Sequence, residues 1–284
     1  MIRKIVIPVR GDGKGDSVFA HAVALAKRYD AHVLVTHCRP RAEDLMPYGI
    51  AIPSALKKLV LEQSKGVADQ VEDGIREEFG ALATQLGITI SEKPATDKAS
   101  ASWLEEQGRQ VDVIKRHGRV ADLICVAKPD RSRNLGSNTL KAALFNTGRP
   151  VMMCPVSDTP PSKLCDTVGI AWNGSIQTSR AIACTTGILD NATQVIVFSS
   201  GVEVAGASTA SLCDYLESRG IAVQVERFES TRNIGRDLLE RCTNAKVDSL
   251  LMGAYSQSHE AETVLGGTTQ YIVDNAEIPV ILVH

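Results

Sequence analysis

The chain has 284 residues, a formal net charge of −2 at pH 7, 44% hydrophobic residues and 4% aromatic residues. This length suggests about two domains, each long enough to bury its own core. The slightly acidic balance argues against a general nucleic-acid binder, and the few aromatic residues argue against base-stacking platforms. The seven cysteines show no C-x-x-C or zinc-ligand spacing, so we interpret them as reduced thiols of a cytoplasmic protein.

The first residues, Met1–Val9, predict a β-strand and not a signal peptide, because they lack a long apolar core and a cleavage site. No apolar run along the chain approaches the roughly 18 residues that a membrane-spanning helix needs. We therefore expect a cytoplasmic protein without a membrane partner.

Apolar runs alternate with helical patterns along the first part of the chain. The runs predict strands at 2–9, 31–37, 88–93, 121–127 and 150–154. Periodic apolar residues predict helices at 18–26, 54–86, 99–117 and 137–146. A glycine-rich loop at 10–16 and an irregular, proline-containing insertion at 39–53 interrupt the alternation.

A segment with two adjacent prolines, residues 157–165, predicts a linker, and beyond it the pattern restarts. Strands are predicted at 167–171, 194–198, 221–228, 247–252 and 279–283. Helices are predicted at 176–189, 203–219 and 231–244, and a further one opens at 266. We expect two domains, residues 1–156 and 166–284.

Short stretches of the two parts align with each other. The aligned pairs are Ile7–Asp12 with Ile170–Ser175, Ala121–Ile124 with Val247–Leu250, and Arg149–Val151 with Ile278–Val280. The order βαβαβαβαβ therefore occurs twice, which predicts α/β parallel sheets with right-handed crossovers.

The last 38 residues hold the most specific pattern of the chain. An apolar run ends on Gly253, a polar loop follows, and Gly266, Gly267, Thr268 and Thr269 open a helix. Free N–H groups at the positive end of a helix suit a phosphate, and Gly253 would let a ligand approach the strand end without meeting a Cβ. An ordinary loop followed by a helix start would give the same spacing.

This pattern, Gly253-x-x-Ser256, nine residues and then Gly266–Thr269, resembles the nucleotide loop of the universal stress proteins, Gly-x2-Gly-x9-Gly-(Ser/Thr). Ser256 replaces the second Gly, and Gly267 replaces the Ser or Thr, so one hydroxyl is lost. The resemblance covers nearly the whole chain. It implies a Rossmann-like fold of two tandem, doubly wound, five-stranded parallel sheets with the strand order 3-2-1-4-5, related by a pseudo-twofold axis.

The resemblance also implies an adenine-nucleotide site in the second domain. Asn173 takes the place of the family's Asp beside the adenine, and its amide can both donate and accept. An Asx turn that caps the next helix is the alternative interpretation of Asn173. The implied nucleotide-binding residues are Ala171, Asn173, Phe198, Met252, Gly253, Ser256, Gly266, Gly267, Thr268 and Thr269.

The first domain departs further from the family pattern. Arg10 replaces the Asp, Ala127 replaces the strand-end glycine, and the following loop is four residues shorter than in the second domain. Gly136, Ser137 and Thr139 still match the family's Gly-Ser-x-Thr, which implies a degenerate anion nest. We therefore expect a nucleotide in the second domain alone.

No nucleophile–base–acid set, G-x-S-x-G or H-E-x-x-H motif occurs in the chain. We expect a non-enzymatic universal stress protein that binds ATP or a related adenine nucleotide, with or without Mg²⁺, and regulates the stress response. A nucleotide-independent scaffold that acts through protein partners is the alternative, and slow ATP hydrolysis is a third.

The fifth strand of each predicted sheet is an apolar edge, which invites pairing. We expect residues 151–154 to pair with residues 280–283, so that the chain forms an intrachain pseudo-dimer. A homodimer of the whole chain is compatible with this arrangement.

Overall fold

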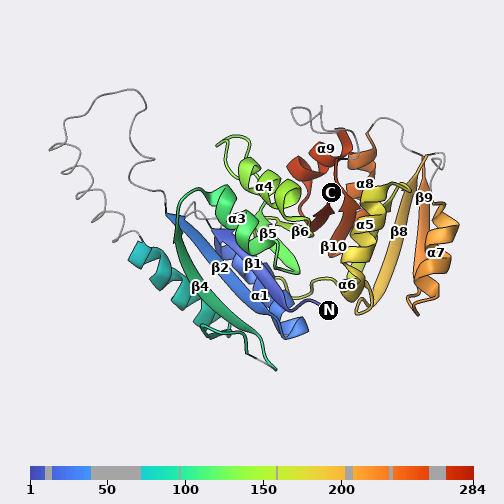
Figure 1. Ribbon diagram of the computed structural model, residues 1–284. Helices are drawn as coiled ribbons and strands as arrows, with labels where there is room; N and C mark the ends of the chain where they lie inside the picture. Colours follow the sequence, from blue (N-terminus) through green and yellow to red (C-terminus); the bar gives the residue numbers. More distant parts are fainter. Residues whose placement is uncertain are drawn as a thin grey trace.

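The computed structural model describes residues 1–9, 15–39, 72–95, 97–157, 159–201, 207–229, 233–255 and 267–284. Its central feature is one eleven-stranded sheet in the order β3-β4-β2-β1-β5-β6-β11-β10-β7-β8-β9 (Figure 1). The strands of the N-terminal half are β1 (Lys4–Val9), β2 (His32–Arg39), β3 (Thr89–Ile90), β4 (Ser100–Gln107), β5 (Leu123–Ala127) and β6 (Val151–Cys154). Those of the C-terminal half are β7 (Thr167–Trp172), β8 (Gln194–Ser200), β9 (Val223–Phe228), β10 (Ser249–Gly253) and β11 (Val280–Val283).

Each half of the sheet has the predicted strand order. The N-terminal half reads β4-β2-β1-β5-β6 and the C-terminal half reads β9-β8-β7-β10-β11, so both follow 3-2-1-4-5. All pairs within each half are parallel. The doubly wound α/β fold is therefore confirmed, with the short β3 as an additional edge strand.

The two halves meet through their fifth strands, as expected. β6 and β11 pair antiparallel, with Val151 opposite Leu282, Met152 opposite Ile281, and Met153 opposite Val280. All four residues of each strand are buried. This seam joins the two predicted sheets into one continuous sheet (Figure 1).

Helices cover both faces of the sheet, and the core forms one layer on each face. One layer contains apolar residues of α1, α5, α6, α7 and the helical residues 72–85, and the other contains residues of α3, α4, α8 and α9. The helices are α1 (Gly15–Tyr29), α3 (Gln110–Gly118), α4 (Ser137–Thr147), α5 (Ile176–Cys184), α6 (Thr186–Leu189), α7 (Thr209–Glu217), α8 (Ile234–Asn244) and α9 (Gly267–Asn275). Burial on both faces explains why the inner strands are nearly continuous apolar runs.

The third strand of the N-terminal half lies where the sequence predicted a helix. The predicted strand at 88–93 is only the two-residue β3, and the predicted helix at 99–117 divides into β4 and α3. Leu104, Glu105 and Glu106 favour a helix, but β4 pairs with β2 over all eight residues. Ala101 is completely buried in the core. Tertiary pairing therefore overrides local helix propensity here.

The predicted helix at 176–189 is also interrupted, because α5 ends at Cys184 and α6 begins at Thr186. The Thr185 hydroxyl donates to the carbonyl of Ala181 at 2.7 Å, and the Thr186 hydroxyl donates to that of Ile182 at 3.1 Å. Such bonds from threonine to the preceding turn bend helices. Two successive threonines thus account for the break.

Several sequence expectations lie outside the described residues: Arg10 with the loop at 11–14, the insertion at 40–53, and the first part of the predicted helix at 54–86. All seven cysteines are described as free thiols, and four of them are buried. None of the described helices is long and apolar enough to cross a membrane.

Candidate functional site

The candidate site lies at the carboxyl ends of β7 and β10, the first and fourth strands of the C-terminal half. These strands are parallel neighbours, with Ala171 opposite Met252. The chain leaves β7 toward α5 and leaves β10 toward α9, on opposite faces of the sheet. This is the switch point at which open α/β sheets bind ligands.

Asn173 and Ser175 build the turn between β7 and α5. The Asn173 Oδ1 accepts from the Ser175 N–H at 3.1 Å and from the Thr178 hydroxyl. Ser175 is the N-cap of α5, and its hydroxyl accepts from the Thr178 N–H at 3.3 Å. Asn173 is exposed, and no hydrogen bond of its Nδ2 occurs within the described part of the chain. The Asx-turn interpretation is therefore confirmed, and the amide N–H₂ stays accessible.

Gly253 has a packing role that the sequence did not indicate. A Cβ at this position would lie 2.6 Å from the backbone nitrogen of Thr178 and 2.8 Å from the carbonyl carbon of Gln177. The space that we expected Gly253 to leave for a ligand is thus filled by the first turn of α5. The glycine allows α5 to pack directly on the end of β10.

Two predicted contact residues have their side chains in the core. Phe198 is 2% exposed and Met252 is 5% exposed, and both belong to the layer under α8 and α9. Alternation along a strand turns them into this layer, away from the edge where a ligand would lie. Any contact of Phe198 or Met252 with a ligand would therefore be made by the backbone at their positions opposite Ala171, and their assignment to the nucleotide site stays a prediction.

The N-terminus of α9 provides the open part of the site. Gly267, its first residue, is exposed, and a Cβ there would meet no described atom within 4 Å. Thr268 is half-buried, whereas Thr269 is turned inward at 7% exposure. The first N–H groups of any helix have no partner within the helix. Ser256 and Gly266 lie outside the described residues.

The corresponding helix start of the N-terminal half is more enclosed. Gly136, the N-cap of α4, has φ of +86°, and Ser137 follows it as the first helical residue. Thr139 is 5% exposed, and its hydroxyl donates to the Gln110 side chain at 3.3 Å. The loop before it closes through two backbone hydrogen bonds between Asp130 and Leu135. The Thr139 hydroxyl is thus already occupied, and Ser137 is half-buried where the corresponding Gly267 is exposed.

Comparison with known proteins agrees with this architecture. The model of the universal stress protein family matches residues 1–132 and 197–284. The chain belongs to this family. This universal stress protein is similar in fold to a universal stress protein from Archaeoglobus fulgidus, with a TM-score of 0.69 and 16% identity over 99% of this chain and 95% of the other.

A second solved structure, a putative universal stress protein from Pseudomonas aeruginosa, is similar with a TM-score of 0.53 and 14% identity, over 99% of this chain and 93% of the other. No significant match was found among curated proteins. At these identities the two structures support the fold of the universal stress protein, including its two-part organisation, and leave its ligand to be argued from its own residues.

Proposed function

We propose that this universal stress protein binds ATP or a related adenine nucleotide at the C-terminal switch point, and that occupancy of the site regulates its role in the stress response. The proposal rests on one observation: two exposed groups that can donate hydrogen bonds to a ligand lie at the carboxyl ends of neighbouring strands. The exposed amide of Asn173 follows β7, and the open N-terminus of α9 follows the neighbouring strand β10.

The N-terminus of α9 is suited to the phosphates. Backbone N–H groups of Gly267 and Thr268 lie in the first turn of a nine-residue helix, where the helix dipole adds partial positive charge. The lack of a side chain at Gly267 lets a phosphate oxygen approach these donors closely. Thr268 adds a half-buried hydroxyl at the same helix end.

Asn173 is suited to the base. Because its Oδ1 already accepts two hydrogen bonds from the start of α5, its role toward a ligand is donation through Nδ2. An adenine ring nitrogen accepts such a bond, whereas the exocyclic amino group would need an acceptor. We therefore assign Asn173 to a ring nitrogen of the base and not to the amino group.

The proposal assigns binding and not catalysis. Among the described residues, no group of three or more His, Cys, Asp or Glu side chains is placed to hold a metal ion. We expect the phosphates of the nucleotide to supply ligands for any Mg²⁺ in the complex. The described residues of the site supply hydrogen-bond donors and a helix dipole.

Isothermal titration calorimetry with ATP on a matched pair of variants tests the proposal. Gly267→Asp and Ser137→Asp each place a carboxylate at the first position of a helix, in α9 and α4 respectively. Asp at this position favours the helix itself, so both variants should fold. Gly267→Asp should weaken ATP binding at least tenfold, or about 1.4 kcal/mol, through charge repulsion, and Ser137→Asp should leave it unchanged.

A nucleotide-independent scaffold is the second candidate. Two features favour it. Asn173 Oδ1 accepts a hydrogen bond from α5, and the first turn of α5 fills the space beside Gly253. Both contacts stabilise the packing of α5 without a ligand. Wild-type protein that binds no adenine nucleotide would support the scaffold. Equal loss of ATP affinity in Gly267→Asp and Ser137→Asp would contradict assignment of the site to the C-terminal half.

A further inference from the structure

The N-terminal half contacts two elements of the C-terminal half that lie beside the candidate nucleotide site. One is Tyr255, which follows the end of β10, and the other is α9, whose first turn supplies the open N–H groups. The contacts come from α4 and from the residues that follow β5. Both α4 and α9 belong to the same core layer, and Figure 1 shows both helices near the seam.

Phe145, in α4, packs against the chain that leaves β10. The ring centroids of Phe145 and Tyr255 are 5.2 Å apart, and those of Phe145 and His284 are 4.8 Å apart in an edge-to-face arrangement. Aromatic rings attract each other in such geometries. The His284 Nδ1 donates to the carbonyl of Ala254 at 3.1 Å. Phe145 therefore contacts Tyr255 directly and, through His284, also the residue before it.

Tyr255 has a backbone that needs support from its side chain. Its φ is +56°, in the left-handed region, where a bulky residue is strained. Burial raises the pKa of the Tyr255 hydroxyl to about 12, and the nearby Asp274 carboxylate of α9 adds to the shift. The ring thus lies between Phe145 and α9, and its packing there offsets the strain of the backbone.

Two cations of the N-terminal half hold the C-terminal end of α9. Lys128 Nζ donates to the carbonyl of Ala276 at 2.9 Å, and Arg131 Nε pairs with Asp274 Oδ1 at 2.8 Å. Gln270 Nε2 donates to the same carboxylate oxygen at 2.7 Å. Positive charge at this end of a helix is favourable. The end of α9 opposite to its open first turn is therefore fixed to the other half.

The internal repeat does not place the same contacts on the N-terminal half. Counted from the first residue of each helix, Asn275 of α9 corresponds to Phe145 of α4, and Leu144 corresponds to Asp274. The Asn275 side chain donates to the carbonyl of Tyr271 in its own helix at 2.8 Å. Leu144 is buried and cannot form an ion pair. These ring and ion-pair contacts are therefore not a general product of the repeated fold.

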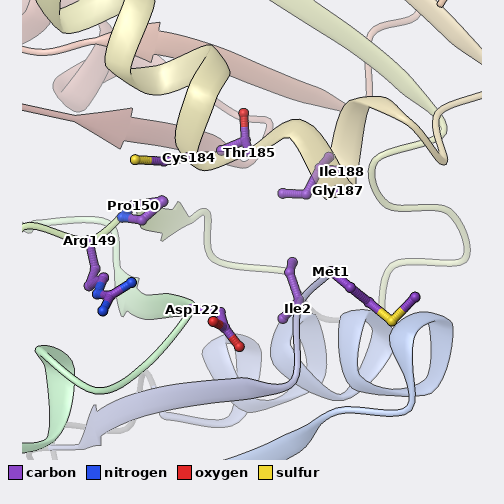
Figure 2. A pocket seen from close by; sticks show the side chains of 9 residues that line it. All are labelled: Met1, Ile2, Asp122, Arg149, Pro150, Cys184, Thr185, Gly187 and Ile188. Atoms are coloured by element: carbon purple, nitrogen blue, oxygen red, sulfur yellow. The ribbon is translucent and has the colours of Figure 1, made fainter. Parts of the chain in front are cut away.

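A second contact between the halves lies on the opposite face of the sheet, where Met1 meets α6. A Cβ at Gly187 would lie 2.7 Å from the Met1 nitrogen. Residues of both halves line a cavity of about 170 Å³ beside this contact (Figure 2). Within the described ranges, no hydrogen bond, ion pair or ring contact joins Met1 or Gly187 to Tyr255 or α9. A substitution at Gly187 thus disturbs the contact of the halves without disturbing these two elements.

We propose that the N-terminal half is a positioning partner of the C-terminal nucleotide site, in which Phe145 holds Tyr255 while Lys128 and Arg131 hold α9. This inference rests on the proposed function and adds residues that control its affinity. N–H groups of a helix N-terminus bind a phosphate only when the helix is oriented toward it, so loss of either contact weakens binding. By linkage, a bound nucleotide strengthens the contact between the halves in turn.

Calorimetric titration of the full chain with ATP tests the role of Phe145 against a matched control. Phe145 and Phe79 are both phenylalanines of the N-terminal half that contact two rings, and those of Phe79 belong to Phe19 and Trp103. We expect Phe145→Ala to weaken ATP binding by about threefold or more. Phe79→Ala and Gly187→Ala should bind ATP like the wild type, at a temperature at which circular dichroism shows all variants folded.

The ion pair between Arg131 and Asp274 allows a test by charge exchange. Arg131→Asp and Asp274→Arg each break the pair, but they change the net charge in opposite directions. A general electrostatic effect on an anionic ligand would weaken binding in the first variant and strengthen it in the second. We expect both variants to weaken ATP binding by about twofold or more, and the double variant to recover the wild-type affinity.

Arg133→Asp is the control for charge, because Arg133 is exposed in the same loop and has no ion pair within the described ranges. It should weaken ATP binding less than Arg131→Asp does. Affinities that follow the net charge, or equal losses in Phe145→Ala and Phe79→Ala, would overturn the positioning role while the nucleotide site stands. No binding of ATP by the wild type would overturn the proposed function and this inference together.

Discussion

Gly253 lies where the last residue of β10 meets the first turn of α5. The backbone of Gln177 and Thr178 occupies the position that a side chain at 253 would need. Backbone atoms cannot rotate away as a flexible side chain can, so a larger residue must displace the helix. The position of α5 in turn fixes Asn173 through the Thr178 hydroxyl.

The substitution Gly253→Ala should therefore destabilise the protein by about 1–3 kcal/mol, the usual cost of overpacking. Gly267→Ala is the matched control, because a Cβ there meets no described atom within 4 Å. It should be neutral or stabilise by up to about 1 kcal/mol, since it removes backbone freedom from the unfolded chain. Urea unfolding followed by circular dichroism measures both changes, and equal stability of the two variants would contradict a rigid contact at Gly253.

The sequence predicted the strand ends and the helix start at which the candidate site lies, but not what each residue contacts there. Gly253 was predicted to let a ligand approach the strand end, whereas the first turn of α5 fills the space that its missing Cβ leaves. Phe198 and Met252 were predicted as contacts, but their side chains are buried. A linear motif gives the position along a strand, whereas the face to which a side chain points follows from pairing across the sheet.

At the scale of elements, three helices of the C-terminal half begin with a side-chain cap. Ser175, Ser208 and Asn233 each accept a hydrogen bond from the backbone N–H three residues later. In the N-terminal half, the N-cap of α3, Arg109, makes no such bond. The N-terminal half therefore offers an internal control for the contribution of a cap.

Asn233→Ala should lower the free energy of unfolding by about 1 kcal/mol, because it leaves the Arg236 N–H, now 3.1 Å from Asn233 Oδ1, without its acceptor. Arg109→Ala should change stability by less than about 0.5 kcal/mol, since Arg109 is exposed and, within the described part of the chain, has only a 4.0 Å ion pair with Asp112 to lose. Chemical denaturation of both variants provides the comparison. A loss in Arg109→Ala as large as in Asn233→Ala would show that these differences do not come from capping.

Elements with a strong pattern were predictable, and elements defined by distant contacts were not. The strands that are buried on both faces agree with prediction to within a few residues. β4 was missed because its sequence favours a helix, whereas its strand conformation comes from pairing with β2. The paired residues lie more than 60 positions apart in the sequence, as His32 and Ser100 do. The break between α5 and α6 was missed for a different reason, because it follows from local hydrogen bonds of Thr185 and Thr186 to the preceding turn, which the apolar periodicity of residues 176–189 does not indicate.

At the scale of the whole molecule, the seam between β6 and β11 is reinforced by side chains that cross from one half to the other. Arg28, at the end of α1, pairs with Asp166 and donates to the carbonyls of Leu164, at 3.1 Å, and Asn191. The division of the chain into domains at residues 157–165 stays a prediction. A continuous sheet, together with these hydrogen bonds and this ion pair between the halves, favours cooperative unfolding of the two halves.

The two tryptophans of the chain allow a direct test, because Trp103 lies in β4 and Trp172 lies in β7, one in each half. In the single-tryptophan variants Trp103→Phe and Trp172→Phe, fluorescence reports on one half, while far-ultraviolet circular dichroism reports on the whole molecule. If the seam couples the halves, the two signals should give the same urea midpoint within each variant.

The substitution Ile281→Ala removes a fully buried side chain of the seam. It should lower the free energy of unfolding by about 2–5 kcal/mol, and the fluorescence and dichroism midpoints should fall together. Separation of the fluorescence and dichroism transitions already in the single-tryptophan variants would show that the halves unfold independently.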